Sequence, residues 1–204
     1  TRVDGGMQGV AERLADGQDV RLGAPVRRIE HGGASVVVHH DGGSVEAARV
    51  IVAVPPHLAA RIDFTPALAG QRAALVAGMP MGSVIKHTAI YRTPFWRARG
   101  LSGLVLDEHG PIHVTFDNSP PGAEVGVLMG FSEADEARTL GKLDLAGRRA
   151  AALACFTRTL GPEAGAPLDY TDHVWADDPW SGGCYGAFCP PGLWTKAGPA
   201  IREP

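Results

Sequence analysis

Short stretches in which apolar and polar residues alternate recur along the chain, and this period of two is typical of β-strands. In the first quarter such stretches follow a helical pattern over residues 8–14, and they predict strands over residues 20–22, 25–29, 35–40 and 45–54. The segment Asp41-Gly42-Gly43 separates the last two and indicates a hairpin turn. This part of the chain is therefore expected to form a small β unit.

The run Val50-Ile51-Val52-Ala53-Val54 contains only apolar residues, which is the pattern of a strand covered on both faces. Pro55-Pro56 follows at once, and proline cannot continue a central strand because it lacks the backbone N–H group. We therefore expect a buried strand that ends at residue 54.

Beyond residue 66 the patterns predict a second, antiparallel sheet covered by helices. Its expected strands are residues 83–91, 103–106, 112–117 and 125–131, and the expected helices are residues 67–78, 132–140 and 144–160. Ser132 with Asp135 resembles a capping arrangement for the second of these helices. From Gly161 onward Gly, Pro, Asp and Trp dominate, so irregular structure is expected there.

Lys86 shares one face of the predicted strand 83–91 with Val84, Thr88 and Ile90. A lysine on an apolar face has two explanations: a desolvated amine in a pocket, or a side chain that reaches solvent from an edge strand. The residues alone favour the edge strand.

Alternation also groups Val114 with Phe116, and Phe131 with Met129, into an apolar and aromatic wall. Such a wall is usually an ordinary core between a sheet and its helices. By itself it does not indicate a ligand.

The segment Ser181-Gly182-Gly183-Cys184-Tyr185 places a thiol beside a phenol, after two glycines that would let another group approach closely. Cys184 is either a small buried hydrophobic residue or a thiol presented to a large planar partner. Trp175 and Trp180 precede it, and they either anchor the loop or stack near a flat cofactor.

The 204 residues are 45% hydrophobic and 20% charged, which is enough for a substantial core. A net charge of -3 provides no field that would attract nucleic acid. Three cysteines form no paired framework and favour a reducing compartment, so a cytoplasmic protein is expected. The eight histidines show no metal-ligand spacing, and no Gly-x-Gly-x-x-Gly loop is present.

Several landmarks in order resemble the flavin-dependent monoamine oxidases over nearly the whole chain. They are Gly5-Gly6-Met7, Pro25-Val26, Val52-Ala53-Val54-Pro55-Pro56, Pro80-Met81-Gly82-Ser83-Val84-Ile85-Lys86, Pro94-Phe95-Trp96, Met129-Gly130-Phe131, Trp175, and Ser181-Gly182-Gly183-Cys184-Tyr185 with Pro190-Pro191-Gly192.

The resemblance implies roles for individual residues. Cys184 matches the cysteine that these oxidases join through sulfur to the 8α-methyl group of FAD, although related bacterial oxidases hold the flavin without a covalent bond. Lys86 matches a lysine that holds a water beside the flavin N5 atom, so the resemblance favours a buried lysine over an edge one. Tyr185 matches one of two tyrosines that enclose the substrate amine, and its partner is expected beyond Pro204.

Further matches concern the substrate cavity and the cofactor. Val114, Phe116 and Phe131 match positions that line the cavity, which implies a pocket for aryl-alkyl amines. Val26 matches a main-chain contact to the adenine end of FAD, and Trp175 matches a tryptophan near the isoalloxazine ring.

The fold implied by the resemblance is a mixture of α+β and α/β structure in two domains. Residues 1–56 are expected to be part of an FAD-binding domain, residues 57–171 a substrate domain with an antiparallel sheet and covering helices, and residues 172–204 a return to the FAD-binding domain with the flavin-attachment loop. The Gly-rich dinucleotide-binding unit of the family is absent, so this stretch alone is expected neither to bind FAD nor to be active.

The implied reaction is oxidation of a primary amine with O2 to an aldehyde, releasing ammonia and H2O2. The expected partners are the amine and O2, without nucleic acid or a membrane segment, and a homodimer is left open. Two alternatives also stay open: a polyamine or L-amino-acid oxidase on the same fold, and a non-catalytic remnant. An acidic pocket would favour polyamines, and none is recognised on the faces of Val114 or Phe131.

Overall fold

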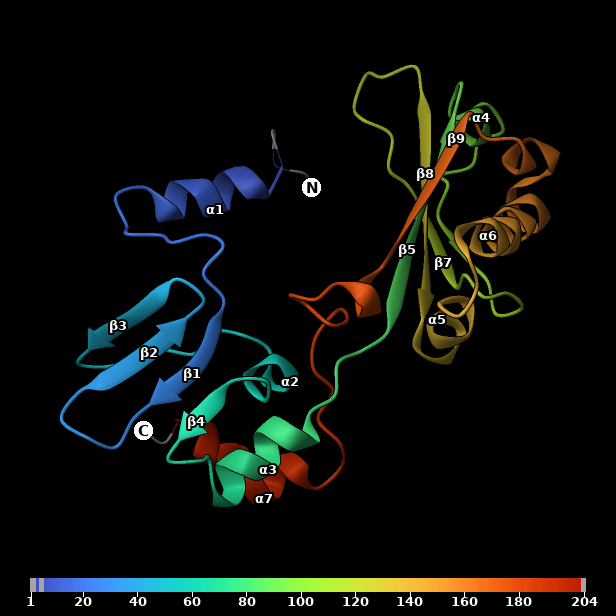
Figure 1. Ribbon diagram of the computed structural model, residues 1–204. Coiled ribbons are helices and arrows are strands. Elements are labelled where there is room, and N and C mark those ends of the chain that lie inside the picture. Colours follow the sequence, from blue (N-terminus) through green and yellow to red (C-terminus); the bar gives the residue numbers. More distant parts are fainter. Residues whose placement is uncertain (1–2, 4–5, 203–204) are drawn as a thin grey trace. The chain divides into compact units, whose positions relative to one another are not determined.

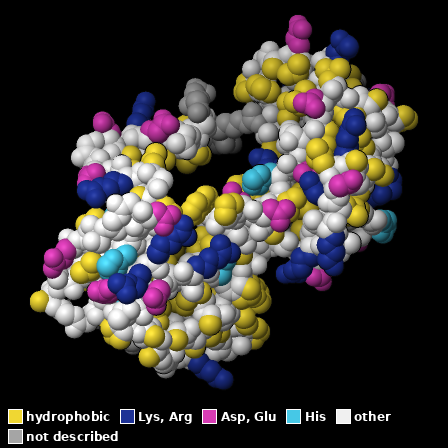
Figure 2. Space-filling view, viewed as in Figure 1, with side chains coloured by type: hydrophobic (Ala, Val, Ile, Leu, Met, Phe, Trp, Pro, Cys, Tyr) yellow, Lys and Arg dark blue, Asp and Glu magenta, His cyan; other side chains and the backbone are white. Residues whose placement is uncertain are grey.

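The computed structural model describes residue 3 and residues 6–202, so Gly5 of the first landmark lies outside the described residues. The chain forms two compact units, Thr1–Val52 with Arg61–Leu68 and Ala53–Ala60 with Ala69–Pro204 (Figure 1). Among the described residues, none of the helices has the length and apolar character needed to span a bilayer. Acidic and basic side chains are interspersed over the face shown in Figure 2.

The first unit contains helix α1 (Gln8–Ala15) and a four-stranded sheet. The strands lie in the order β3-β2-β1-β4, with bounds Val26–Glu30 for β1, Val36–His40 for β2, Gly43–Ala47 for β3 and Asp63–Thr65 for β4. The chain turns between His40 and Gly43, which pair with each other, so the predicted hairpin is confirmed. Strand β4 runs parallel to β1, and the other neighbours are antiparallel.

Two predicted strands of this region are wrong. Residues 20–22 form no strand, since only Leu22 belongs to a turn and the two residues before it are irregular, and residues 50–54 form no strand either; Ile51 is 89% exposed. A strand needs a neighbour to accept and donate its backbone hydrogen bonds, and none of the described strands pairs with residues 50–54. Apolar composition alone therefore did not decide the structure.

The second unit is built on a five-stranded antiparallel sheet in the order β6-β7-β8-β5-β9. Its strands are β5 (Val84–Tyr91), β6 (Val105–Leu106), β7 (Val114–Asp117), β8 (Gly126–Glu133) and β9 (Asp169–Val174). Strand β5 pairs with β8 on one side and β9 on the other, so Lys86 does not lie on an edge strand. Strand β9 corrects the expectation that the chain is irregular after Gly161.

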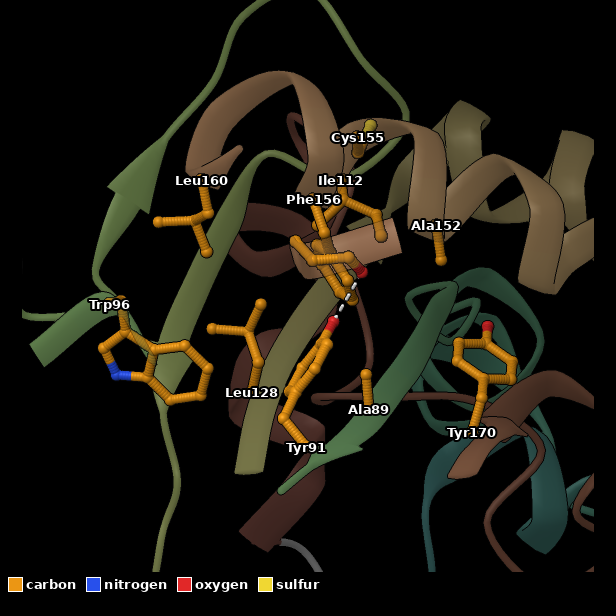
Figure 3. Packing of buried hydrophobic residues seen from close by; sticks show 11 residues of the cluster. Ala89, Tyr91, Trp96, Ile112, Leu128, Ala152, Cys155, Phe156, Leu160 and Tyr170 are labelled. Atoms are coloured by element: carbon orange, nitrogen blue, oxygen red, sulfur yellow. Dashed lines mark hydrogen bonds between the residues drawn. The ribbon is translucent and has the colours of Figure 1, made fainter. Parts of the chain in front are cut away.

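Helices α5 (Ala134–Leu140) and α6 (Leu145–Leu160) cover one face of this sheet (Figure 1). Buried side chains from the sheet, from α6 and from the short helix α4 (Phe95–Ala98) form the main core (Figure 3), which includes Ala89, Tyr91, Trp96, Ile112, Leu128, Ala152, Cys155, Phe156 and Leu160. A Cβ atom on Gly130 would lie only 2.8 Å from Ile112 and 2.9 Å from Phe156, so the glycine lets this core close.

The cap of α5 differs from the prediction. Ser132 lies within β8 and is buried, and Glu133 precedes the helix without a capping hydrogen bond from its side chain. In α6 the predicted start is confirmed, because Oδ1 of Asp144 accepts a hydrogen bond of 2.8 Å from the N–H group of Gly147. Ser132 is used elsewhere, in the core of the sheet.

The remaining elements of the second unit are short. They are α2 (Pro56–Ala59), α3 (Gly70–Gly78), α7 (Leu193–Ala197) and the 3-10 helices η1 (Pro162–Gly165), η2 (Trp175–Asp177) and η3 (Gly198–Arg202). Leu75 of α3 packs with Ala197 and Ala200 in a second small core. The predicted mixture of helices with an antiparallel sheet is confirmed.

Candidate functional site

The face of the five-stranded sheet opposite α5 and α6 carries most of the predicted site residues. Lys86 on β5 lies opposite Phe131 on β8 and opposite His173 on β9. Phe131 in turn lies opposite Val114 on β7. Neighbouring residues of one cross-strand row share a face, so Val114, Phe131, Lys86 and His173 form a line across four strands. We call this side of the sheet the open face.

Burial distinguishes the two faces of β5. Its helix-covered side chains, among them Ile85, His87 and Ala89, are almost fully buried, whereas Lys86 and Thr88 are half-buried. Lys86 is therefore a charged side chain at the centre of a sheet, on the side that the helices leave uncovered. The role as water holder beside a flavin stays a prediction.

Aromatic rings continue the open face from the sheet into the loop that follows β9. Phe116 and Phe131 meet edge to face with ring centroids 6.1 Å apart, and Phe131 contacts the ring of Tyr185 at 6.1 Å. Phe116 is 41% exposed and Tyr185 is 67% exposed. The structure thus brings four predicted residues into one surface: Val114, Phe116, Phe131 and Tyr185.

The loop that carries Cys184 is held against residues 80–82 by backbone hydrogen bonds. The N–H group of Cys184 donates to the carbonyl of Gly82 at 2.9 Å, and the N–H group of Gly82 donates to the carbonyl of Gly186 at 3.0 Å. A Cβ atom on Gly82 would overlap the carbonyl oxygen of Cys184, and one on Gly183 would overlap the carbonyl oxygen of Gly82. The missing side chains of these glycines therefore let the chain approach itself.

Glu133 is a functional candidate that the sequence analysis missed. It is two residues beyond Phe131 on β8, opposite Val84, so it lies on the open face. Burial, and after it the neighbouring carboxylate of Glu133, raise the pKa of the Tyr185 phenol to about 12. The sequence analysis recognised no acidic pocket on the face of Phe131; alternation from Phe131 would have placed this single carboxylate there.

The thiol of Cys184 is half-buried. Burial, and after it the charge of Glu133, raise the pKa of Cys184 above its ordinary value. The thiol is consequently protonated at neutral pH in this environment, so it needs to lose a proton before it can act as a nucleophile.

Three large side chains around Cys184 are exposed: Trp180 at 69%, Tyr185 at 67% and Phe188 at 60%. Exposed rings beside a half-buried thiol fit a planar, largely apolar group better than water. The residues present therefore fit a flavin ring at this loop.

The two other predicted cofactor contacts are placed as follows. Trp175 begins η2 directly after β9, is half-buried and contacts the ring of His173 at 4.4 Å. Val26 begins β1 in the first unit and pairs with His40 there. Their contacts to FAD stay predictions.

A buried polar chain lies behind the open face and was also missed. Nε2 of His87 is 2.9 Å from Oγ of Ser132, and Nδ1 is 2.7 Å from the hydroxyl of Tyr170. That hydroxyl lies 3.2 Å from Oδ2 of Asp172, whose carboxylate accepts two hydrogen bonds of 2.9 Å from Arg148. Burial, opposed by Asp172 and assisted by Arg148, lowers the pKa of His87 to about 4.

The ionised Asp172 orders this chain, because a carboxylate accepts hydrogen bonds only. The hydroxyl of Tyr170 then donates to Asp172, the Nδ1–H group of His87 donates to the oxygen of Tyr170, and the hydroxyl of Ser132 donates to Nε2 of His87. Each side chain is satisfied with His87 neutral. This series of hydrogen bonds ends at a cavity of about 360 Å³. The cavity is lined by Arg148, Asp172, His173, Val174, Asp177, Asp178 and Pro179.

Comparison with known proteins adds independent information. A family model described as flavin containing amine oxidoreductase matches residues 1–202. A protein of Mycobacterium tuberculosis (strain CDC 1551 / Oshkosh) named as a flavin-containing monoamine oxidase, AofH, is 44% identical over 205 residues, which are 100% of this chain and 44% of the relative. Flavin-containing amine oxidase B of Canis lupus familiaris is 37% identical over 98% of this chain and 40% of its own length.

Solved structures agree with the fold. A variant of putrescine oxidase, in which an alanine was changed to cysteine during a redesign of cofactor binding, superposes with a TM-score of 0.92 and 37% identity, over 98% of this chain and 45% of that chain. The chain thus spans less than half the length of the proteins that it matches.

Proposed function

The chain belongs to the family of flavin-containing amine oxidoreductases, and from this premise we propose that the intact protein is an oxidase of primary amines. The proposed reaction consumes an aryl-alkyl amine and O2 and yields an aldehyde, ammonia and H2O2. The observation that carries the proposal is the open face, where Lys86 lies among aromatic side chains next to the loop of Cys184 and Tyr185.

The cofactor in this proposal is FAD, bound covalently through Cys184. When bound, the flavin supplies the two-electron chemistry that these side chains lack. The half-buried thiol and the exposed rings around it support this assignment. Val26 and Trp175 are proposed to contact the adenine end and the isoalloxazine ring.

The residues of the open face then bind and orient the amine. The rings of Phe131 and Tyr185 present faces and edges to a cationic or polarised nitrogen, and they exclude water from it. Phe116 and Val114 extend the apolar surface along β7 for the hydrocarbon part of the substrate. Lys86 holds a water at the centre of the sheet, where an ammonium group has three donors and no acceptor.

The test uses the full-length protein. After acid denaturation and digestion, mass spectrometry is expected to find the flavin on the peptide that contains Cys184, and anaerobic addition of 2-phenylethylamine is expected to bleach the flavin absorbance. A Cys184→Ala variant is expected to release its flavin on denaturation and, reconstituted with FAD, still to be reduced by the amine. Absence of flavin from the full-length protein, or no reduction by a panel of primary amines, would refute the proposed function.

A further inference from the structure

Glu133 places a carboxylate on the open face at the end nearest the thiol and the phenol. It is the last residue of β8, and the backbone beyond it is fixed because the N–H group of Ala134 donates to the carbonyl of Ser83 at 2.9 Å. The side chain of Glu133 is half-buried. Its position is therefore set by the sheet rather than by a mobile loop.

The ring of Tyr185 lies beside the end of β8 that carries Glu133. Phe131 packs against the ring, with centroids 6.1 Å apart, and Glu133 is two residues further along the same face. The loop is also docked there, because Cys184 and Gly186 bond to Gly82, next to the start of β5, where Val84 lies opposite Glu133.

The carboxylate of Glu133 has capacity for hydrogen-bond donors. An ionised carboxylate offers about four acceptor positions. Among the described residues, Glu133 makes no ion pair with a lysine, an arginine or a histidine. The titratable and charged groups that face it are Tyr185 and Cys184 from the loop and Lys86 from β5 on the same face of the sheet; Asp135, Glu136 and His113 belong to α5 and to the segment before β7.

We propose that Glu133 binds the ammonium form of the substrate amine at the phenol of Tyr185 and so determines which protonation state of the substrate the site captures. The inference rests on the proposed amine oxidase function. An ammonium group supplies the positive charge and the three donors that a half-buried carboxylate beside aromatic rings lacks. Amines of the lysine type are almost wholly protonated at pH 7, so this is the form that arrives.

The carboxylate of Glu133 affects binding of the amine and its deprotonation in opposite directions. A nearby carboxylate favours the charged form, so it raises the pKa of the bound amine. Oxidation needs the nitrogen lone pair, so the bound ammonium group has to lose its proton to water first. Removing the carboxylate therefore weakens capture of the ammonium form and, at the same time, makes the bound amine easier to deprotonate.

Three variants of the full-length holoenzyme test this. Glu133→Gln keeps an acceptor for Tyr185 but removes the charge, Glu133→Leu removes both, and Glu136→Gln is the matched control. Glu136 lies three residues further on, on α5, and its carboxylate is 3.9 Å from His113. Flavin content and melting temperature are recorded for each variant. KM and kcat are measured with 2-phenylethylamine as substrate.

For Glu133→Gln at pH 7 we expect KM and kcat to rise together by about tenfold, which is the effect of about one pKa unit, with little change in kcat/KM. The acid limb of the kcat profile is expected to move to lower pH, and the difference in KM to vanish above the pKa of the free amine. Glu133→Leu is expected to lose kcat/KM as well, because an apolar side chain leaves no acceptor for the ammonium group or for the phenol beside it. Glu136→Gln is expected to behave as wild type.

If one of the variants is unstable, the affinity for unreactive ligands tests the inference instead. Benzyltrimethylammonium carries a permanent charge, and benzyl alcohol is neutral. Glu133→Asp, the conservative variant, is expected to keep most of the affinity for the cation, while Glu133→Gln loses about tenfold for the cation and nothing for the alcohol. Equal KM, kcat and cation affinity in Glu133→Gln and Glu136→Gln would overturn the inference and leave the oxidase function intact. A wild-type holoenzyme whose flavin no amine reduces would overturn both.

Discussion

Protonation of the buried His87 is expected to destabilise the fold at mildly acidic pH. The imidazole is 0% exposed and neutral, and both its ring nitrogens are engaged by Ser132 and Tyr170. A proton on Nε2 would point at the hydroxyl of Ser132, which then has to rotate and stop donating. The charge itself would be placed in the core, where the counter-charge is Asp172, and Asp172 is already paired with Arg148.

The magnitude follows from the two pKa values of His87. The value is 6.5 in an unfolded chain and about 4 in the fold, where burial lowers it. The unfolded state binds the proton first as pH falls, so the free energy of unfolding is unaffected above pH 6.5 and decreases between pH 6.5 and 4. A separation of about 2.5 units corresponds to a total of about 3 kcal/mol, of which about 2 kcal/mol is lost by pH 5.

Urea unfolding of the intact protein at several pH values between 7 and 4 measures this loss. Carboxylates also titrate below pH 5, so the relevant quantity is the difference between wild type and a His87→Gln variant, which keeps a neutral polar side chain without a titrating ring. The wild type is expected to lose about 2 kcal/mol more than the variant between pH 7 and pH 5. If both lose the same amount, the buried neutral histidine does not control acid stability and the reasoning is wrong.

Three further substitutions test the loop, the open face and the core one at a time. Gly82→Ala is expected to displace the loop and abolish covalent flavin on Cys184, measured by acid precipitation, whereas Gly186→Ala, whose Cβ meets nothing within 4 Å, retains it. Lys86→Met is expected to lower amine-dependent O2 uptake by about a hundredfold at unchanged melting temperature, because the side chain is only half-buried; unchanged uptake would refute its role. Gly130→Ala overpacks the core and is expected to cost about 1–3 kcal/mol in urea unfolding.

The sequence predicts those strands whose alternation has an apolar face to bury. In β5 and β8 the covered face is apolar except for His87 and Ser132, and period two located both strands within two residues of their observed bounds. Strand β9 was missed because one of its covered positions is Asp172, a charged residue that pairs with Arg148, so the covered face is not a run of apolar residues. The prediction of a strand over residues 50–54 failed for the opposite reason, since these residues are apolar but have no described strand beside them.

In the candidate site, too, local alternation predicts some features and misses those that depend on distant residues. Lys86 and Phe131 could be placed on one face from alternation alone, but their position at the centre of a sheet depends on β9. The contact between Glu133 and Tyr185 joins residues 52 positions apart in the sequence, and no local pattern specifies it. Pairings over such distances are set by the order of the strands and by loop docking, which a single sequence does not reveal.

The way in which the loop of Cys184 docks onto residues 80–82 has a consequence for how this surface diversifies. The hydrogen bonds that hold Cys184 and Gly186 against Gly82 join main-chain atoms, and this close approach depends on the absence of side chains at Gly82 and Gly183. Loop side chains that make no contact of their own can thus change without loosening these hydrogen bonds. A group held by the thiol would keep its position relative to β5 while the residues around it vary, so substrate preference can drift without disturbing the place where the chemistry happens.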